Sequence, residues 1–127
     1  AQEIAKFLQV HPKVESVNYL GLLDEHSPNY ETYKKQYSSP GAMISFYIKG
    51  GEAEAFRFLN HLKLIKLAVS LGSTESLIQH PATMTHIGLP EDVKLKIGIT
   101  EQLVRISVGI EHYEDLIMDI ETALEYV

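Results

Sequence analysis

One arginine stands inside an apolar stretch of the sequence, where a guanidinium needs an anionic partner or water. In LVRISVG, the two-residue period of a strand places Arg105 on one face with Leu103 and Ser107 and turns the side chains between them to the other face. The planar guanidinium keeps its charge and matches the two oxygens of a carboxylate. Arg105 therefore either grips a carboxylate ligand or lies on an exposed or edge face of a sheet, and the residues alone leave both interpretations open.

A second polar segment, SLGSTES at residues 70–76, has the composition of an anion-binding turn. Gly72 permits backbone angles that other residues avoid, and the hydroxyl and amide groups of Ser73 and Thr74 can converge on an anion. The spacing is too loose for a phosphate-binding loop. A plain turn or a helix cap is the simpler interpretation of the same residues.

Histidines are the remaining candidates for chemistry, and their spacing argues against a metal site. His80 and His86 lie six residues apart in QHPATMTH, which fits neither neighbours on a helix nor a usual zinc spacing, and no third ligand is evident. The sequence also contains no glycine-rich dinucleotide motif, nucleophile elbow or pair of catalytic carboxylates. We therefore expect no metal, and the motifs alone predict no more than a folded domain.

Composition narrows the class of protein further. A chain of 127 residues with 45% hydrophobic and 22% charged residues is typical of one globular domain. A net charge of -6, with only two arginines, argues against a nucleic-acid partner, and no apolar run reaches the length of a membrane helix. The absence of cysteine excludes a disulfide framework and fits a cytoplasmic protein. Because the first predicted helix lacks both an initiator Met and a capping side chain, we expect the sequence to be part of a longer protein.

Helices and strands alternate along the chain. Period-two segments predict strands at residues 14–20, 42–49 and 103–110, with a short further strand at 77–78 inside a long loop. Apolar residues at helical spacing predict helices at 1–10, 52–66, 91–97 and 111–127, and a Tyr30, Tyr33, Tyr37 spacing predicts a short helix whose tyrosines pack. The order predicts an α/β (α+β) two-layer sandwich with helices mainly on one face, and it leaves the strand directions open.

Three long motifs resemble the Cys/Met-metabolism family of enzymes that depend on pyridoxal 5'-phosphate (PLP). They are PGAMISF at 40–46, LAVSLGSTESLIQHPATMTH at 67–86 and GITEQLVRISVGIEHYEDLIMDIETAL at 98–124. The family includes methionine γ-lyase, cystathionine γ-lyase and γ-synthase, and O-acetylhomoserine sulfhydrylase. The similarity extends over nearly the whole chain. Leu20 and Leu23 depart from it by standing where the family often has prolines, which affects loop shape only.

The resemblance implies a fold and a set of site residues. Residues 1–127 correspond to the small C-terminal domain of type I (aspartate aminotransferase-like) PLP enzymes, and the large PLP-binding domain lies outside the sequence. Arg105, in LVRISVG, and Ser70, in VSLG, match residues that bind the α-carboxylate of the substrate. The Schiff-base lysine of the family follows a threonine, and no Thr-Lys pair occurs here. We therefore expect no catalytic or cofactor-binding residue in this chain.

For the complete protein, the resemblance implies a PLP-dependent carbon–sulfur lyase or sulfhydrylase in methionine and cysteine metabolism, acting in trans-sulfuration or a related reaction. Its partners would be an amino-acid substrate, its own large domain and the other subunits of a homo-oligomer. The fragment alone is expected to be inactive and to bind no PLP. The alternative is a free-standing module that binds an amino acid or serves in assembly without catalysis. The residues do not decide between elimination and replacement, nor the choice of substrate.

Overall fold

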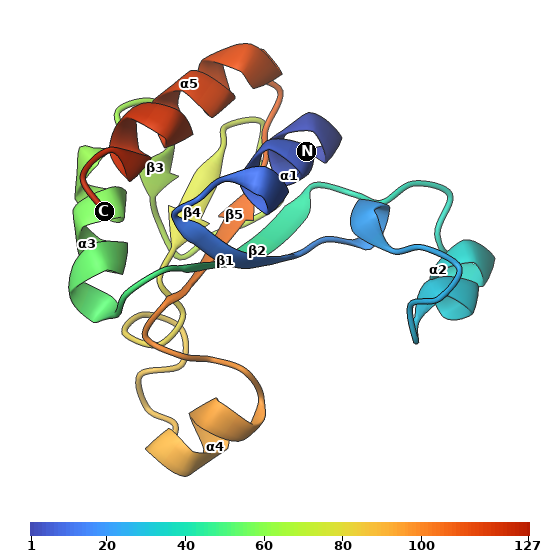
Figure 1. The fold of residues 1–127 in the computed structure, drawn as a ribbon, viewed down its shortest axis with the longest axis horizontal. Coiled ribbons are helices and arrows are strands. Elements are labelled where there is room, and N and C mark those ends of the chain that lie inside the picture. The colour runs from blue at the N-terminus through green and yellow to red at the C-terminus, as the bar shows by residue number, and fades with distance from the viewer.

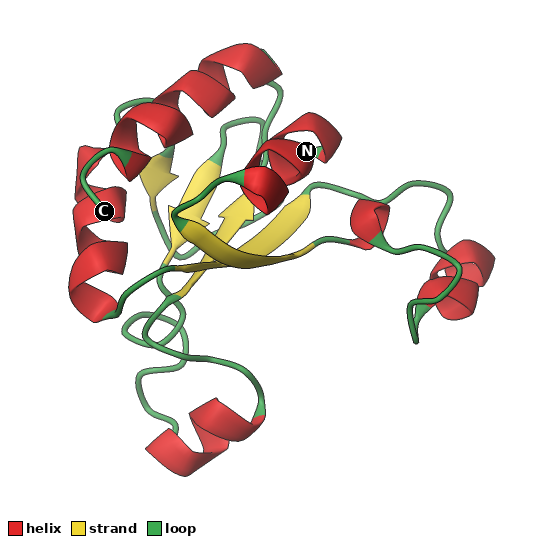
Figure 2. Ribbon diagram, viewed as in Figure 1, coloured by secondary structure: helices red, strands yellow, loops and turns green.

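The computed structural model describes all residues, 1–127, and contains one five-stranded sheet (Figure 2). The strand order is β1-β2-β5-β4-β3. All neighbouring strands are antiparallel except β3 and β4, which are parallel. The strand bounds are β1 Val14–Asn18, β2 Met43–Ile48, β3 Lys66–Leu67, β4 Leu77–Gln79 and β5 Leu103–Ser107. The sheet is therefore mixed, and β5 lies at its centre.

Three helices cover one face of this sheet, and the other face carries no helix (Figure 1). The helices of the covering layer are α1 Gln2–Val10, α3 Glu52–His61 and α5 Tyr113–Leu124. Their apolar sides meet every second residue of the central strands, so that Phe46 of β2 and Ile106 of β5 are fully buried. Phe46 packs edge-on against Phe58 of α3 with ring centroids 5.8 Å apart. The predicted two-layer α/β sandwich is confirmed.

Helix α3 ends five residues earlier than the predicted helix of 52–66. After His61 the chain turns, and the backbone amides of Lys63, Leu64 and Ile65 donate to the carboxylate of Asp119 at 2.8 to 3.0 Å. A carboxylate that accepts three amides replaces the bonds that another helical turn would have made. Because Asp119 lies on α5, this signal is invisible in the sequence around residue 62.

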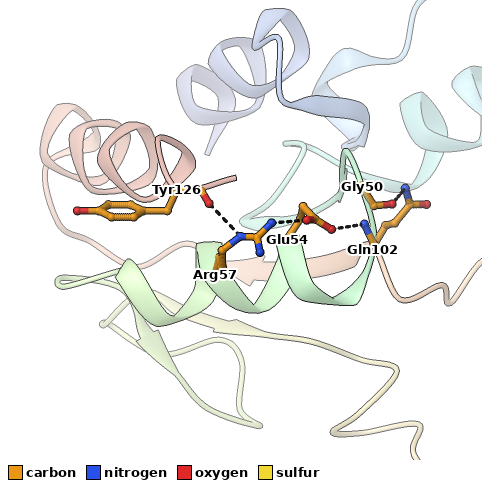
Figure 3. Close-up of polar contacts among 6 residues, drawn as sticks. Gly50, Glu54, Arg57, Gln102 and Tyr126 are labelled. Carbon is orange, nitrogen blue, oxygen red and sulfur yellow. Dashed lines mark hydrogen bonds and ion pairs between the residues drawn. The ribbon is translucent and has the colours of Figure 1, made fainter.

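The other end of α3 is tied to two distant segments (Figure 3). Glu54 accepts a hydrogen bond from the Gly51 amide at 2.8 Å and pairs with Arg57, which also donates to the Tyr126 carbonyl at 3.1 Å. The bond from Gly51 is the main reason that the pKa of Glu54 is lowered. Gln102 donates to the Gly50 carbonyl at 2.8 Å. These contacts fix α3 between the C-terminal residues and the start of β5.

Two segments extend away from the sheet, one ending in α2 (Tyr30–Gln36) and the other in α4 (Glu91–Lys96) (Figure 1). Neither helix has a buried residue, and neither does the short 3-10 helix η1 at Leu20–Leu22. The expected helix over Tyr30, Tyr33 and Tyr37 is present, but its tyrosines do not join the core, and Tyr37 is 54% exposed. Tyr33 and Tyr37 instead pack against each other, with ring centroids 6.1 Å apart. No helix of the chain has both the length and the apolar composition to cross a membrane.

Candidate carboxylate site on the open face of the sheet

The face without helices, which we call the open face, carries a polar row across four strands. In register, Arg105 of β5 lies between Gln79 of β4 and Ser45 of β2, and Asn18 of β1 stands beyond Ser45. Side chains opposite one another on neighbouring strands are close enough to interact directly. The alternation predicted for residues 103–108 is confirmed, because Val104 on the covered face is fully buried while Arg105 is partly exposed. The strand thus presents the guanidinium on the open face.

The residues on either side of Arg105 on the same face of β5 are covered. Leu103 packs with Ala82 and Ile99 in a small second cluster formed by the segment that carries α4. Ser107 is 2% exposed because its hydroxyl accepts a hydrogen bond from the Gly72 amide at 2.8 Å. Arg105 therefore lies between these two covered residues and is itself only partly covered.

Gln79 holds the Arg105 guanidinium from one side. A guanidinium has only donors, so the Gln79 amide is oriented with its oxygen toward Arg105, where it accepts from Nε at 3.0 Å and from Nη2 at 2.5 Å. Gln79 itself is 1% exposed, which makes it a fixed support. One amide oxygen cannot bind all five N–H groups of an arginine. Since no carboxylate of the chain pairs with Arg105, the remaining N–H groups are available to a ligand.

The second arginine of the chain is in the opposite situation. Arg57 lies on the surface of α3, pairs with Glu54 and donates to the carbonyl of Tyr126 (Figure 3). Its charge is already matched by a carboxylate of the same helix. Of the two arginines, only Arg105 keeps a charge that the chain does not neutralise.

Ser70, the other predicted site residue, is exposed on the loop between β3 and β4. No hydrogen bond joins it to Arg105. The loop is nevertheless held at the open face, because Gly72 binds the hydroxyl of Ser107, two residues along the strand from Arg105. Residues two apart on a strand stand on the same face about 7 Å from each other. The fold therefore brings the loop of Ser70 to the neighbourhood of Arg105 without completing a joint site.

The same loop is anchored by a carboxylate that the sequence did not single out. Glu111 accepts from the amide of Ser76 at 2.7 Å and from its hydroxyl at 2.8 Å, and the Ser76 hydroxyl accepts from the Gly109 amide at 2.8 Å. Burial would raise the pKa of Glu111, but the hydrogen bonds from Ser76 and from its own amide outweigh burial and lower it. Gln79 and Glu111 were missed because their partners lie far away in the sequence.

The anion-binding turn suggested for residues 70–76 takes another form. The hydroxyl of Ser76 and the amide of Gly72 bind groups of the chain itself, and Gly72 has a φ of +72°. This left-handed angle is the backbone freedom that the sequence predicted for a glycine there. Ser73 and Thr74 make no side-chain hydrogen bond that would gather them around an anion.

The histidines have structural surroundings. His80 is 1% exposed, and its ring nitrogens contact the Thr83 hydroxyl at 2.8 Å and the Glu101 carbonyl at 2.7 Å. Its ring also packs edge-on against Phe56. His86 contacts the hydroxyl of the adjacent Thr85. His80 thus joins the start of the α4 segment to the residues that lead into β5, and no group of three or more potential metal ligands is present.

Two lysines of the chain donate hydrogen bonds to backbone carbonyls. Lys13 donates to the carbonyls of Leu124 and Glu125 at 2.9 and 3.1 Å, and Lys66 donates to the carbonyl of Lys63. Neither Arg105 nor Ser70 lines any hollow of the molecular surface.

The open face therefore presents a row of polar side chains with one arginine that no carboxylate of the chain neutralises. Residues 1–125 match the model of the family described as Cys/Met metabolism PLP-dependent enzyme. The chain belongs to this family, as its motifs predicted.

The relatives and solved structures agree with this assignment. The chain is 54% identical over 127 residues to an L-methionine gamma-lyase of Fusobacterium nucleatum, and 48% identical over 127 residues to a cystathionine gamma-lyase of Bacillus subtilis. Both matches cover all of this chain and 32% and 33% of the relative. The chain therefore spans about a third of the length of these relatives.

Two crystal structures contain the same fold. A cystathionine gamma-lyase of Micromonospora echinospora superposes with a TM-score of 0.90 at 42% identity, over 98% of this chain and 32% of that one. An O-acetylhomoserine (thiol)-lyase of Campylobacter jejuni also gives 0.90, at 36% identity over 98% of this chain and 30% of that one, and it contains an N'-pyridoxyl-lysine-5'-monophosphate.

Proposed function

We propose that residues 1–127 form the C-terminal small domain of a PLP-dependent carbon–sulfur lyase or sulfhydrylase, and that Arg105 binds the α-carboxylate of its amino-acid substrate. One observation carries the second part. Arg105 is held by the buried Gln79 on one side and has no acidic partner, so its free N–H groups can bind a carboxylate in two-point fashion. Substrates with this group are named for the relatives: L-methionine, cystathionine and O-acetylhomoserine.

Ser70 is proposed as a second ligand of the same carboxylate. Its hydroxyl is exposed and makes no hydrogen bond within the chain, and its loop is bonded to Ser107 on the strand of Arg105. A serine hydroxyl can donate one hydrogen bond to a carboxylate oxygen. The two side chains would then orient the substrate from two elements of the fold.

We propose that PLP binding and the catalytic steps belong to the large domain of the complete protein. PLP supplies an electron sink when bound, and the protein around it supplies binding and orientation. Since the Thr-Lys pair of the family's lysine motif does not occur here, we expect this chain alone to hold no PLP. Treating it with PLP and borohydride, followed by mass mapping, should label no single lysine stoichiometrically. One saturable site of labelling would contradict this assignment.

The partners of the open face follow from the same proposal. Because the relatives are about three times longer, we propose that the large domain of the same protein and the subunits of a homo-oligomer enclose Arg105 and Ser70. A cytoplasmic location is proposed from the lack of cysteine. A free-standing amino-acid-binding module is disfavoured, since neither residue lines a hollow that would enclose a ligand.

Replacing Arg105 by alanine in the complete enzyme tests the proposal. Truncating one partner of a hydrogen-bonded charge pair costs about 2–5 kcal/mol, which corresponds to a loss of roughly thirtyfold to several thousandfold in kcat/KM. Assays with L-methionine, L-cystathionine and O-acetyl-L-homoserine would use whichever amino acid the wild type turns over. PLP occupancy, read from absorbance, should stay at the wild-type level. Equal activity of Arg105→Ala and wild type, with PLP retained in both, would remove the proposed role of Arg105.

A further inference from the structure

The turn between β5 and α5 grips the loop of residues 68–76, which we call the Ser70 loop. Both oxygens of the Glu111 carboxylate are used on Ser76, one by its amide and one by its hydroxyl. Glu111 has no Lys, Arg or His as ion partner, so the Ser70 loop is its only bonded neighbour outside its own turn. Charge-assisted hydrogen bonds of this kind are about twice as strong as neutral ones.

The two segments also touch through their backbones. The Ile110 amide donates to the Thr74 carbonyl at 2.9 Å, and a Cβ atom on Gly109 would come within 2.4 Å of that same carbonyl oxygen. Any side chain at position 109 would therefore push the Ser70 loop away. Glycine at this position permits the close approach on which the Glu111 contact depends.

The tip of the loop has little other support. Ser70, Leu71 and Gly72 are all exposed, and their one hydrogen bond to the sheet runs from the Gly72 amide to the Ser107 hydroxyl. At the base, Lys66 and Ala68 pair with the backbone of Ser76 and Ile78. Next to this base, the bonds from Ser76 to Glu111 and from Ile110 to Thr74 hold the second half of the loop.

We propose that Glu111 is a positioning residue that fixes Ser70 relative to Arg105, which rests on the proposed function of these two residues. Arg105 and Glu111 lie on one continuous segment, the central strand and the turn that follows it. This one segment therefore carries Arg105 directly and holds the loop of Ser70 through the contact between Glu111 and Ser76. With the loop held, the substrate carboxylate would bind both Arg105 and Ser70. Without Glu111 the loop would move, and the hydrogen bond from Ser70 would be lost.

The experiment measures KM and kcat of the complete enzyme with whichever of L-methionine, L-cystathionine and O-acetyl-L-homoserine the wild type turns over. Glu111→Ala should raise KM by about tenfold, the factor that corresponds to the loss of one hydrogen bond of about 1.4 kcal/mol. Glu111→Gln should raise it less, because an amide oxygen still accepts from the Ser76 amide. Glu125→Ala, a truncation of an exposed glutamate near the end of α5, is the matched control and should leave KM unchanged.

A double-mutant cycle with Ser70→Ala separates positioning from general stability. If Glu111 acts through Ser70, the double variant should be no worse than the more affected single variant. Independent, multiplying effects on KM would overturn the inference, as would a normal KM in Glu111→Ala when Ser70→Ala is impaired. A normal KM in Ser70→Ala would instead remove Ser70 from the proposed site, and the role of Glu111 with it. Should Glu111→Ala fail to fold, Ser76→Ala removes the hydroxyl bond alone and should give a smaller, equally non-additive rise.

Discussion

The two faces of the sheet are built from the same strands and differ in almost every physical property. On the covered face, Phe46 and Ile106 are fully buried and belong to the apolar core beneath the helices. On the open face, the residues next to them, Ser45 and Arg105, face each other in register and lack a helix above them. One face is complete within this chain, while the other presents polar groups with unused hydrogen-bonding capacity.

This difference shows how one strand serves two purposes. Because side chains alternate along β5, each residue that packs the core fixes the direction of a neighbour on the open face. The rigidity of the covered face thus holds Arg105 in place, and Gln79 on the next strand adds a lateral support. Disturbing either face should have separate and measurable consequences.

The largest effect on stability is expected on the covered face. Phe46→Ala removes a fully buried ring that contacts Phe58, and should lower the free energy of unfolding by about 3–5 kcal/mol. Ser45→Ala, one residue away on the open face, should change it by no more than about 0.5 kcal/mol. Urea denaturation of the 127-residue chain measures both. Similar losses for the two variants would show that the open face is as tightly packed as the covered one.

The next largest effect is expected when the arginine on the open face is replaced by lysine. In the complete enzyme, Arg105→Lys keeps the charge but loses the planar fork, so we expect kcat/KM to fall by roughly ten- to a hundredfold, as for one lost hydrogen bond to a charged group. Arg57→Lys is the matched control on the covered side of the molecule and should leave kcat/KM unchanged. Full activity of Arg105→Lys would mean that charge alone suffices at this position.

A weaker effect is expected from the apolar side chains that flank the open face and the α4 segment. Leu71 is 55% exposed, Ile87 68% and Leu95 57%. Contiguous exposed apolar surface of more than a few hundred Å² usually marks an interface. The chain alone should therefore gain mass with concentration in analytical ultracentrifugation, and Ile87→Ser with Leu95→Ser should reduce this. A strictly monomeric chain at high concentration would argue against a missing partner.

The smallest effect is the pH dependence of the Glu111 contact. The pKa of Glu111 is lowered in the folded chain, because the bonds from Ser76 outweigh the opposing effect of burial. Its contribution to stability is therefore complete above the unfolded pKa of about 4.3 and is lost as the pH falls through the lower folded value. The difference in unfolding free energy between wild type and Glu111→Gln, at most about 1 kcal/mol since solvent screens the group, should shrink toward zero at low pH. An equal difference at neutral and acid pH would contradict this.

Local patterns in the sequence determined most of the elements, the sandwich and the side of the strand on which Arg105 lies, but not the strand β3 at Lys66–Leu67. Alternation in 42–49 and 103–110 and helical spacing in 111–127 depend on neighbours along the chain, and these are present in the sequence. The long family motifs determined the family as well, because they extend over nearly the whole chain.

Only the tertiary structure decided which distant residues meet. The strand order β1-β2-β5-β4-β3 brings Gln79 beside Arg105, and Ser76 reaches Glu111 from thirty-five residues away. Asp119 ends α3 early by the same kind of long-range contact, and the tyrosines of α2 stay outside the core because their helix lies away from the sheet. These contacts depend on the register between strands and on the placement of loops, neither of which leaves a periodic signal in a single sequence.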